Sequence, residues 1–127
     1  RYAQSALWSA GEWRRHAIDG AQQAFVTRLP EVTFGRALAA VVATLPPGGA
    51  RLALDNYESP AALSHCHLLN DNPVCLAFGA ERGWSAGERD SLRAHGFSFV
   101  HLGARVLRME TACIAAVALV KAKLGSL

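Results

Sequence analysis

Short, mostly apolar runs alternate with longer stretches of mixed polarity beyond residue 50 of this chain. The runs lie at 51–55, 74–78 and 97–102, and each has the length and composition of a strand that is buried on both faces. A final helix is expected over 110–124. Strands of this kind that alternate with helices predict an α/β domain, in which a parallel sheet is flanked by helices.

The pentapeptide Trp-Ser-Ala-Gly-Glu occurs at 8–12 and again at 84–88. Each copy has the spacing of a capping box, in which the serine accepts a hydrogen bond from the glutamate amide and the glutamate side chain bonds back to the serine amide. The copies predict helices over about 10–25 and 85–95, the second ended by Gly96. We interpret them as repeated capping chemistry and not as a domain repeat.

Prolines and glycines bound the remaining predicted elements. Pro30 ends the first helical region, because it has no amide hydrogen and restricts the residue before it. Thr33 can cap a second helix that runs through Leu45, where the Pro-Pro-Gly-Gly turn follows. The Ser-Pro pair at 59–60 can open a short helix, and Asn-Asp-Asn-Pro at 70–73 predicts a turn.

The last predicted helix is apolar on nearly every side from 112 to 120. A helix on the surface of a monomer would not tolerate this pattern, so we expect it at the centre of the core or at a subunit interface. Its uncharged part is about half as long as a bilayer span, and no membrane segment is expected.

Composition narrows the class of protein. The 127 residues predict one domain over 1–127, and 51% apolar with 18% charged residues excludes intrinsic disorder. The net charge of +3 permits a polyanionic partner without requiring one. Eleven of the 13 cationic residues are arginine, which suits bidentate phosphate contacts.

Cysteines and the first residues bear on location. Cys66, Cys75 and Cys113 are odd in number and form no Cys-x-x-Cys pair, which fits a reduced, cytoplasmic compartment. The chain begins without Met and without the order of a signal peptide, so we expect it to start inside a longer gene product.

Candidate chemistry lies in the loops after two of the predicted strands, because ligands bind beyond the carboxyl ends of strands in α/β sheets. The loops at 79–83 and 103–111 combine glycines with arginines that can bind phosphate or an oxyanion. Equally, the glycines can serve tight turns and the arginines can be solvated. Neither loop has a phosphate-binding or dinucleotide fingerprint. His65 and His67 are too few to bind zinc, so no metal is predicted.

Several segments together resemble RsmE-type ribosomal RNA methyltransferases, of the SPOUT class. They are Leu-Ala-Phe-Gly-Ala-Glu-Arg-Gly-Trp-Ser at 76–85 and Leu-Gly-Ala-Arg-Val-Leu-Arg-Met-Glu-Thr-Ala at 102–112, with Gly-Ala-Gln-Gln at 20–23 and Leu-Pro-Glu-Val at 29–32 upstream. The resemblance spans about 16–124, and the 102–112 string is its most specific part.

The resemblance implies a function and an architecture. The family methylates N3 of a uridine in small-subunit ribosomal RNA with S-adenosylmethionine as the methyl donor, and its C-terminal segment forms a trefoil knot. Its members are typically homodimers, here expected to pack through the helix at 110–124. The family's N-terminal RNA-binding barrel is expected to be absent from this chain.

The resemblance also assigns roles to single residues. Arg108 is expected to stabilise the uracil anion, with Arg105 as the alternative, and Glu81 can accept from the uracil or from the donor's amino group. Gln23 and Arg82 are expected to face the RNA substrate. The residues expected to line the methyl donor are Leu54, Gly79, Leu102, Gly103, Leu107 and Thr111.

Structural roles are available to the same residues. Arg108 can pair with Glu110 or tie the knot, Leu54 can be plain core, and Gln23 can be solvated. The chain also departs from the family, with Gly-Ala-Glu-Arg-Gly at 79–83 in place of Gly-Pro-Glu-Gly-Gly and Val26 in place of an arginine. The alternative function is therefore a catalytically silent nucleic-acid-binding or dimerisation module; a generic nucleotide-binding domain lacks the phosphate motifs.

Overall fold

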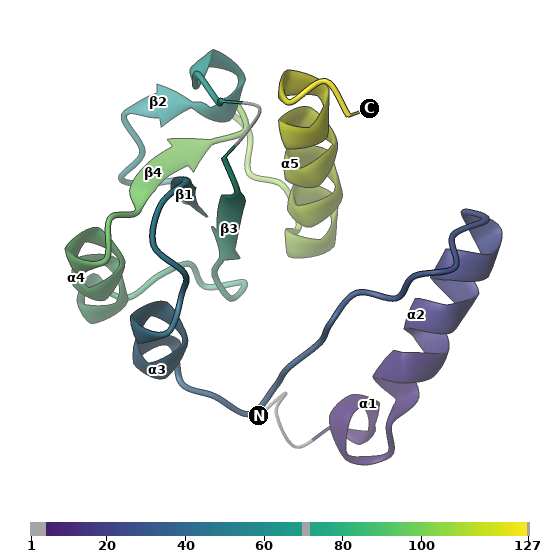
Figure 1. Cartoon of the computed structure of the whole chain (residues 1–127). Coiled ribbons are helices and arrows are strands. Elements are labelled where there is room, and N and C mark those ends of the chain that lie inside the picture. Colours follow the sequence, from purple (N-terminus) through teal and green to yellow (C-terminus); the bar gives the residue numbers. More distant parts are fainter. Residues whose placement is uncertain (1–4, 70–71, 127) are drawn as a thin grey trace. The chain divides into compact units, whose positions relative to one another are not determined.

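The computed structural model describes residues 5–69 and 72–126 (Figure 1). The chain divides into two compact units, Arg1–Ala37 and Leu38–Leu127. The expectation of one domain over the whole chain stays a prediction.

The first unit holds two helices, α1 (Ala6–Ser9) and α2 (Glu12–Gln23). The capping box predicted for Ser9 is wrong. Ser9 lies in the last turn of α1, where its hydroxyl donates to the carbonyl of Ser5 at 3.2 Å. The residue before α2 is Gly11, with a φ of 70° and no side-chain cap. Because Gly11 reverses the backbone here, the predicted single helix from residue 10 begins two residues later, at Glu12.

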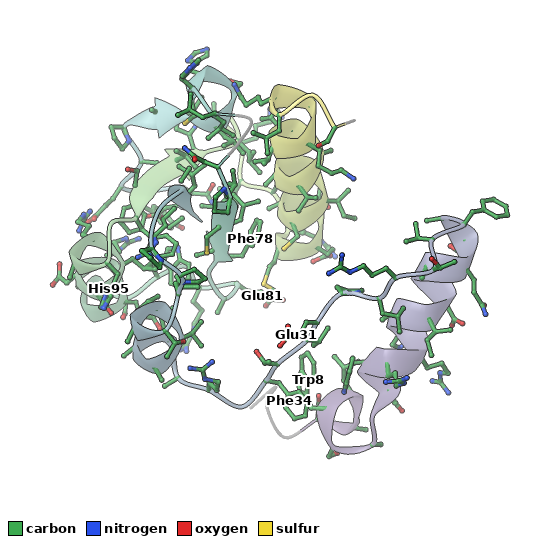
Figure 2. The ribbon with its side chains drawn as sticks, viewed as in Figure 1. Trp8, Glu31, Phe34, Phe78, Glu81 and His95 are labelled. Atoms are coloured by element: carbon green, nitrogen blue, oxygen red, sulfur yellow. The ribbon has the colours of Figure 1, made fainter. Side chains whose placement is uncertain are left out.

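The segment after α2 has no regular secondary structure up to residue 37. The Trp8 ring stacks on Phe34 with 5.1 Å between ring centroids, as Figure 2 shows. The helix predicted from Thr33 is too long: α3 covers only Leu38–Ala43. Gly35 has a φ of 80°, a left-handed conformation that a right-handed helix cannot contain.

The second unit is built on a four-stranded parallel sheet in the order β2-β4-β1-β3. The strands are β1 (Ala50–Leu54), β2 (Ala61–Ala62), β3 (Val74–Phe78) and β4 (Ser98–His101). β1 lies at the centre and pairs with both β3 and β4. The three long predicted strands and the parallel α/β class are confirmed.

Helices cover both faces of this sheet (Figure 1). On one face, Leu52 and Val100 pack against Ala116 and Val120 of α5 (Met109–Lys123). On the other face, a second cluster joins Ala53 and Phe99 of the sheet to α3 and α4 (Ala86–Ala94). Neighbouring residues on β1 thus face opposite layers, as the pleat of a strand requires.

The segment between β1 and β3 differs from its prediction. No helix starts at Ser59, whose hydroxyl donates to the carbonyl of Asp55. The chain forms the short strand β2 and then a 3₁₀ turn at Leu63–His65, which Lys123 of α5 holds through the carbonyls of Ser64 and Cys66. The turn predicted at 70–73 falls partly outside the described residues.

The two C-terminal helices match their predictions closely. Ser85 accepts from the Glu88 amide at 3.1 Å, and the Glu88 carboxylate accepts from the Ser85 amide at 2.7 Å, so this capping box is confirmed. Helix α5 contributes to the core, yet Ile114 and Val117 are 73% and 47% exposed in the single chain. Within the described ranges, no helix is both long and apolar enough to cross a membrane.

Candidate functional site

The carboxyl ends of three strands meet at one edge of the sheet. Leu54 at the end of β1 pairs with Phe78 at the end of β3 and with Val100 of β4. The loops that follow these strands therefore start side by side, where open α/β sheets bind ligands. Figure 2 shows Phe78 and, in the loop after it, Glu81.

A pocket lies at this edge, and we call it the strand-end pocket. Apolar walls and a small number of polar side chains surround it, which is the usual character of a small-molecule site. The residues that line it are Leu54, Asp55, Asn56, Tyr57, Phe78, Gly79, Ala80, Glu81, Gly83, His101, Leu102, Arg105, Val106, Leu107, Met109 and Ala112.

A second pocket adjoins the first, and we call it the arginine pocket. It shares Glu81, Val106, Leu107 and Met109 with the strand-end pocket and adds Arg108 and Glu110. The two pockets therefore adjoin and have part of their lining in common.

The structure brings most of the predicted site residues together. Of the residues expected around the donor, four line the strand-end pocket: Leu54, Gly79, Leu102 and Leu107. All three candidate catalytic residues line a pocket, with Arg105 in the first, Arg108 in the second and Glu81 in both. Among the described residues, no ion pair joins Arg108 to Glu110.

Four predicted residues line neither pocket: Arg82, Gly103, Thr111 and Gln23. Arg82 is exposed in the loop after β3, and Gln23 is exposed at the end of α2 in the first unit. Gly103 has a φ of 117°, and an added Cβ there would meet no atom within 4 Å. This φ favours glycine at position 103. The Gly103 amide also donates to Nδ1 of His101, a pocket residue, at 3.1 Å.

The Trp84 ring packs against the loop that follows β3. A Cβ added to Gly79 would lie 3.2 Å from the Trp84 ring, so only glycine lets the loop approach the indole without a shift. The indole Nε1 donates to the carbonyl of Leu54 at 2.9 Å. Trp84 therefore ties the Gly79–Gly83 loop to the end of β1.

Sequence reasoning missed the segment after β1, where Asp55, Asn56 and Tyr57 line the strand-end pocket. The rule that pointed to the loops after β3 and β4 applies equally to β1, and it would have found them. It also missed His101, the last residue of β4, and Met109 in the first turn of α5.

Asp55 is the one buried charged residue of the described chain, at 5% exposure. Arg89 of α4 donates to both carboxylate oxygens, from Nε at 2.8 Å and from Nη2 at 3.2 Å. Burial raises the pKa of Asp55, but the hydrogen bonds from Arg89 and from the Tyr57 amide, with the charge of Arg89, outweigh burial and hold the pKa below its ordinary value. Asp55 is therefore ionised at neutral pH.

The chain is similar to known methyltransferases. Residues 1–121 match the family described as RNA methyltransferase domain. The chain is 34% identical over 126 residues to ribosomal RNA small subunit methyltransferase E of Treponema pallidum, across 95% of this chain and 47% of that protein.

Solved structures give the same picture. A ribosomal RNA small subunit methyltransferase E from Neisseria gonorrhoeae, bound to S-adenosyl methionine, is 25% identical with a TM-score of 0.75, across 88% of this chain and 46% of that one. A putative methyltransferase from Legionella pneumophila, in complex with the cofactor SAM, is 27% identical with a TM-score of 0.75, across 88% and 45%. This chain spans about half the length of these relatives.

Proposed function

Because the chain belongs to the RNA methyltransferase domain family, we propose that it is the S-adenosylmethionine-dependent catalytic part of a ribosomal RNA methyltransferase that acts on N3 of a uridine. The resemblance expected from the sequence is confirmed. The trefoil knot stays a prediction.

The observation that carries the proposal is the pair of adjoining pockets beyond the strand ends. A methyl transfer between two substrates needs both to be held in line, with the acceptor facing the donor. The strand-end pocket and the arginine pocket share Glu81 and Leu107, so a donor in the first pocket would lie next to an acceptor in the second. We assign the first pocket to the methyl donor and the second to the target base.

The residues of the strand-end pocket fit S-adenosylmethionine. Leu54, Phe78 and Leu102 supply apolar surface for the adenine, while the carboxylate of Glu81 favours a cationic ligand and Arg105 can bind its carboxylate. When bound, this cofactor supplies the methyl group from its sulfonium.

Arg108 is the residue to which we assign stabilisation of the acceptor. Loss of the N3 proton leaves negative charge on the uracil oxygens, and a guanidinium beside them stabilises it. Arg108 is exposed at the N-cap of α5 and lines the arginine pocket. Glu81 lines both pockets and can accept a hydrogen bond from either ligand.

Ribosomal RNA is the proposed macromolecular partner, and this substrate would place the protein in the cytoplasm. The exposed side chains of Arg82, in the second unit, and of Gln23, in the first, offer donors for RNA phosphates or base edges.

Calorimetry with S-adenosylhomocysteine tests the donor site. Binding in the micromolar to millimolar range, about 4–8 kcal/mol, is expected. ATP is the control ligand, because a generic nucleotide-binding domain would bind it as well. Binding of S-adenosylhomocysteine alone supports the proposal; no heat with either ligand indicates a catalytically silent module.

Arg108→Ala separates binding from chemistry. If Arg108 stabilises mainly the transition state, the variant should lower kcat by about 10²–10³ on small ribosomal subunits that lack the methyl group, with little change in donor affinity. Arg108→Lys should restore little, because an ammonium cannot reproduce the planar fork. An equal loss of donor affinity and rate would make Arg108 a donor-binding residue instead.

We also propose a homodimer that packs through α5. Ile114 and Val117 lie one turn apart and are exposed in the single chain, although both are apolar. Val117→Asp should therefore give a monomer in sedimentation, because a carboxylate buried without a partner at the interface is unfavourable. Ser126→Asp, on an exposed residue beyond α5, is the matched control. A dimer that survives Val117→Asp would place the interface elsewhere.

A further inference from the structure

Hydrogen bonds to Asp55 stabilise the segment that follows β1. The Tyr57 amide donates to Oδ1 of Asp55 at 3.1 Å, and the Ser59 hydroxyl donates to the Asp55 carbonyl. These local bonds fold 55–59 into a tight turn around a carboxylate that is itself inaccessible. The turn forms one wall of the strand-end pocket, through Asp55, Asn56 and Tyr57.

Helix α4 also binds this turn, through Arg89. Arg89 binds the Asp55 carboxylate through two nitrogens, and the Asp55 and Arg89 side chains are only 1% and 13% exposed. Five residues earlier, Trp84 donates to the carbonyl of Leu54. The short segment 84–89 therefore hydrogen-bonds to two consecutive residues at the end of β1, Leu54 and Asp55.

Tyr57 lies at the rim of the pocket with its ring largely uncovered. The residue is 75% exposed, and a Cβ added to Gly83 in the opposite loop would lie 3.6 Å from the ring. The ring therefore stands beside the Gly79–Gly83 loop, at the pocket that also contains Glu81. An aromatic face in this position offers a flat apolar surface to a planar ligand.

We propose that Tyr57 contacts the nucleoside of the bound methyl donor and that Asp55 and Arg89 are positioning residues that hold the backbone at Tyr57 in place. This inference rests on the donor site proposed above. A buried ion pair contributes little to stability compared with apolar packing, but its two-pronged geometry allows one arrangement of the turn. Rigid placement of a contact before binding strengthens affinity, because less disorder is lost when the ligand arrives.

Within the part of the chain that the structure describes, Asp55 and Arg89 belong to a small network of charged side chains. Arg89 also faces Glu58 at 3.7 Å, and Glu58 pairs with Arg93 at 2.8 Å, which in turn lies 3.8 Å from Asp90. Glu88 on the same helix adds a further negative charge near Arg89. The carboxylates of Glu58 and Asp90 are half or more exposed, so the buried contact of the network is Asp55 with Arg89.

The experiment is a double-mutant cycle on the 127-residue chain, with S-adenosylhomocysteine as the probe. Tyr57→Ala and Asp55→Asn should each raise Kd by about tenfold, the loss expected for an aromatic stacking contact. Tyr57→Phe should keep wild-type affinity, because it keeps the ring. The double variant Asp55→Asn/Tyr57→Ala should bind no more weakly than Tyr57→Ala, because Asp55 acts through Tyr57.

Controls separate this mechanism from a loss of fold. Asp90→Asn makes the same carboxylate-to-amide change on the exposed side of α4 and should leave Kd unchanged. If circular dichroism shows that Asp55→Asn does not fold, Arg89→Lys takes its place in the cycle, since it keeps the charge and loses the two-pronged bond.

Two results would overturn the inference: Kd unchanged in Tyr57→Ala, or additive losses in the double variant, which would make Asp55 a structural residue. Absence of wild-type binding would instead contradict the donor site itself.

Discussion

At 84–88 the pentapeptide Trp-Ser-Ala-Gly-Glu begins α4 with a complete capping box, whereas the same five residues at 8–12 span the end of α1 and the start of α2. The fourth residue shows the difference most clearly. Gly87 is helical in α4, while Gly11 has a φ of 70° and separates two helices. Identical residues therefore support a helix start in one place and a helix break in the other.

The residues that precede each copy explain part of this difference. Gly83, with a φ of 79°, turns the chain just before Trp84, and Ser85 is then extended and free to act as a cap. Before the first copy, a helix has already begun at Ala6, so Ser9 lies inside it and cannot cap. A capping box needs a non-helical serine, and the five residues alone do not provide one.

Contacts distant in sequence explain the rest. Trp84 packs against Gly79 and donates to Leu54, so the second copy is anchored to the sheet. Trp8 stacks on Phe34, a residue of an irregular segment that is itself half exposed. The copy that caps a helix is thus the one that a rigid neighbour holds in place.

Replacing each of the two tryptophans by alanine should give the largest difference in stability between the two copies. Trp84→Ala removes ring packing and a hydrogen bond, and it should lower the free energy of unfolding by about 3 kcal/mol; Trp8→Ala removes mainly a ring stack, at about 1 kcal/mol. Urea unfolding followed by far-ultraviolet circular dichroism measures both.

Trp84→Phe divides the larger effect into its parts. It keeps most of the ring and loses the bond to the Leu54 carbonyl, which should cost about 1 kcal/mol. Equal losses in Trp84→Ala and Trp8→Ala would show that anchoring to the sheet does not distinguish the two copies.

The same contrast shows which parts of the fold could be predicted from the sequence. The apolar run at 74–78 and the mostly apolar run at 51–55 predicted β3 and, within one residue, β1, because strands buried on both faces leave a simple pattern. The break at Gly11 and the shortened α3 were missed, because a glycine's left-handed conformation depends on neighbours that the local pattern does not contain.

The site was predictable to a similar extent. The strand-end rule indicated the loops after β3 and β4, and of their three arginines Arg105 and Arg108 line a pocket while Arg82 does not. Glu81, which lines both pockets, was expected from the family resemblance and not from this rule. The role of Asp55 was not predictable, since its partner Arg89 lies 34 residues away and only the fold brings them together.

Replacing Gly11 or Gly87, the glycines of the two copies, by alanine should change the free energy of unfolding in opposite directions. Gly11→Ala forces a side chain into the left-handed region and should destabilise by about 1–2 kcal/mol. Gly87→Ala, in a helix with open space around it, should stabilise by about 0.5 kcal/mol. The midpoints of urea unfolding measure both changes. Destabilisation by both variants would mean that Gly87 is needed for something other than its place in α4.

The smallest contrast concerns the serines themselves. Ser85→Ala leaves the Glu88 amide without its acceptor and should cost about 1 kcal/mol, whereas Ser9→Ala loses only an exposed bond within α1 and should change stability by about 0 kcal/mol. Amide hydrogen exchange at the start of α4 gives a local measure, because fraying should speed exchange there in Ser85→Ala. Ser85→Asp is the control, since an aspartate can accept the same bond and should restore protection. If Ser9→Ala destabilised the protein as much as Ser85→Ala, the first copy would act as a cap in solution, and the difference between the two copies would lie only in their tryptophans.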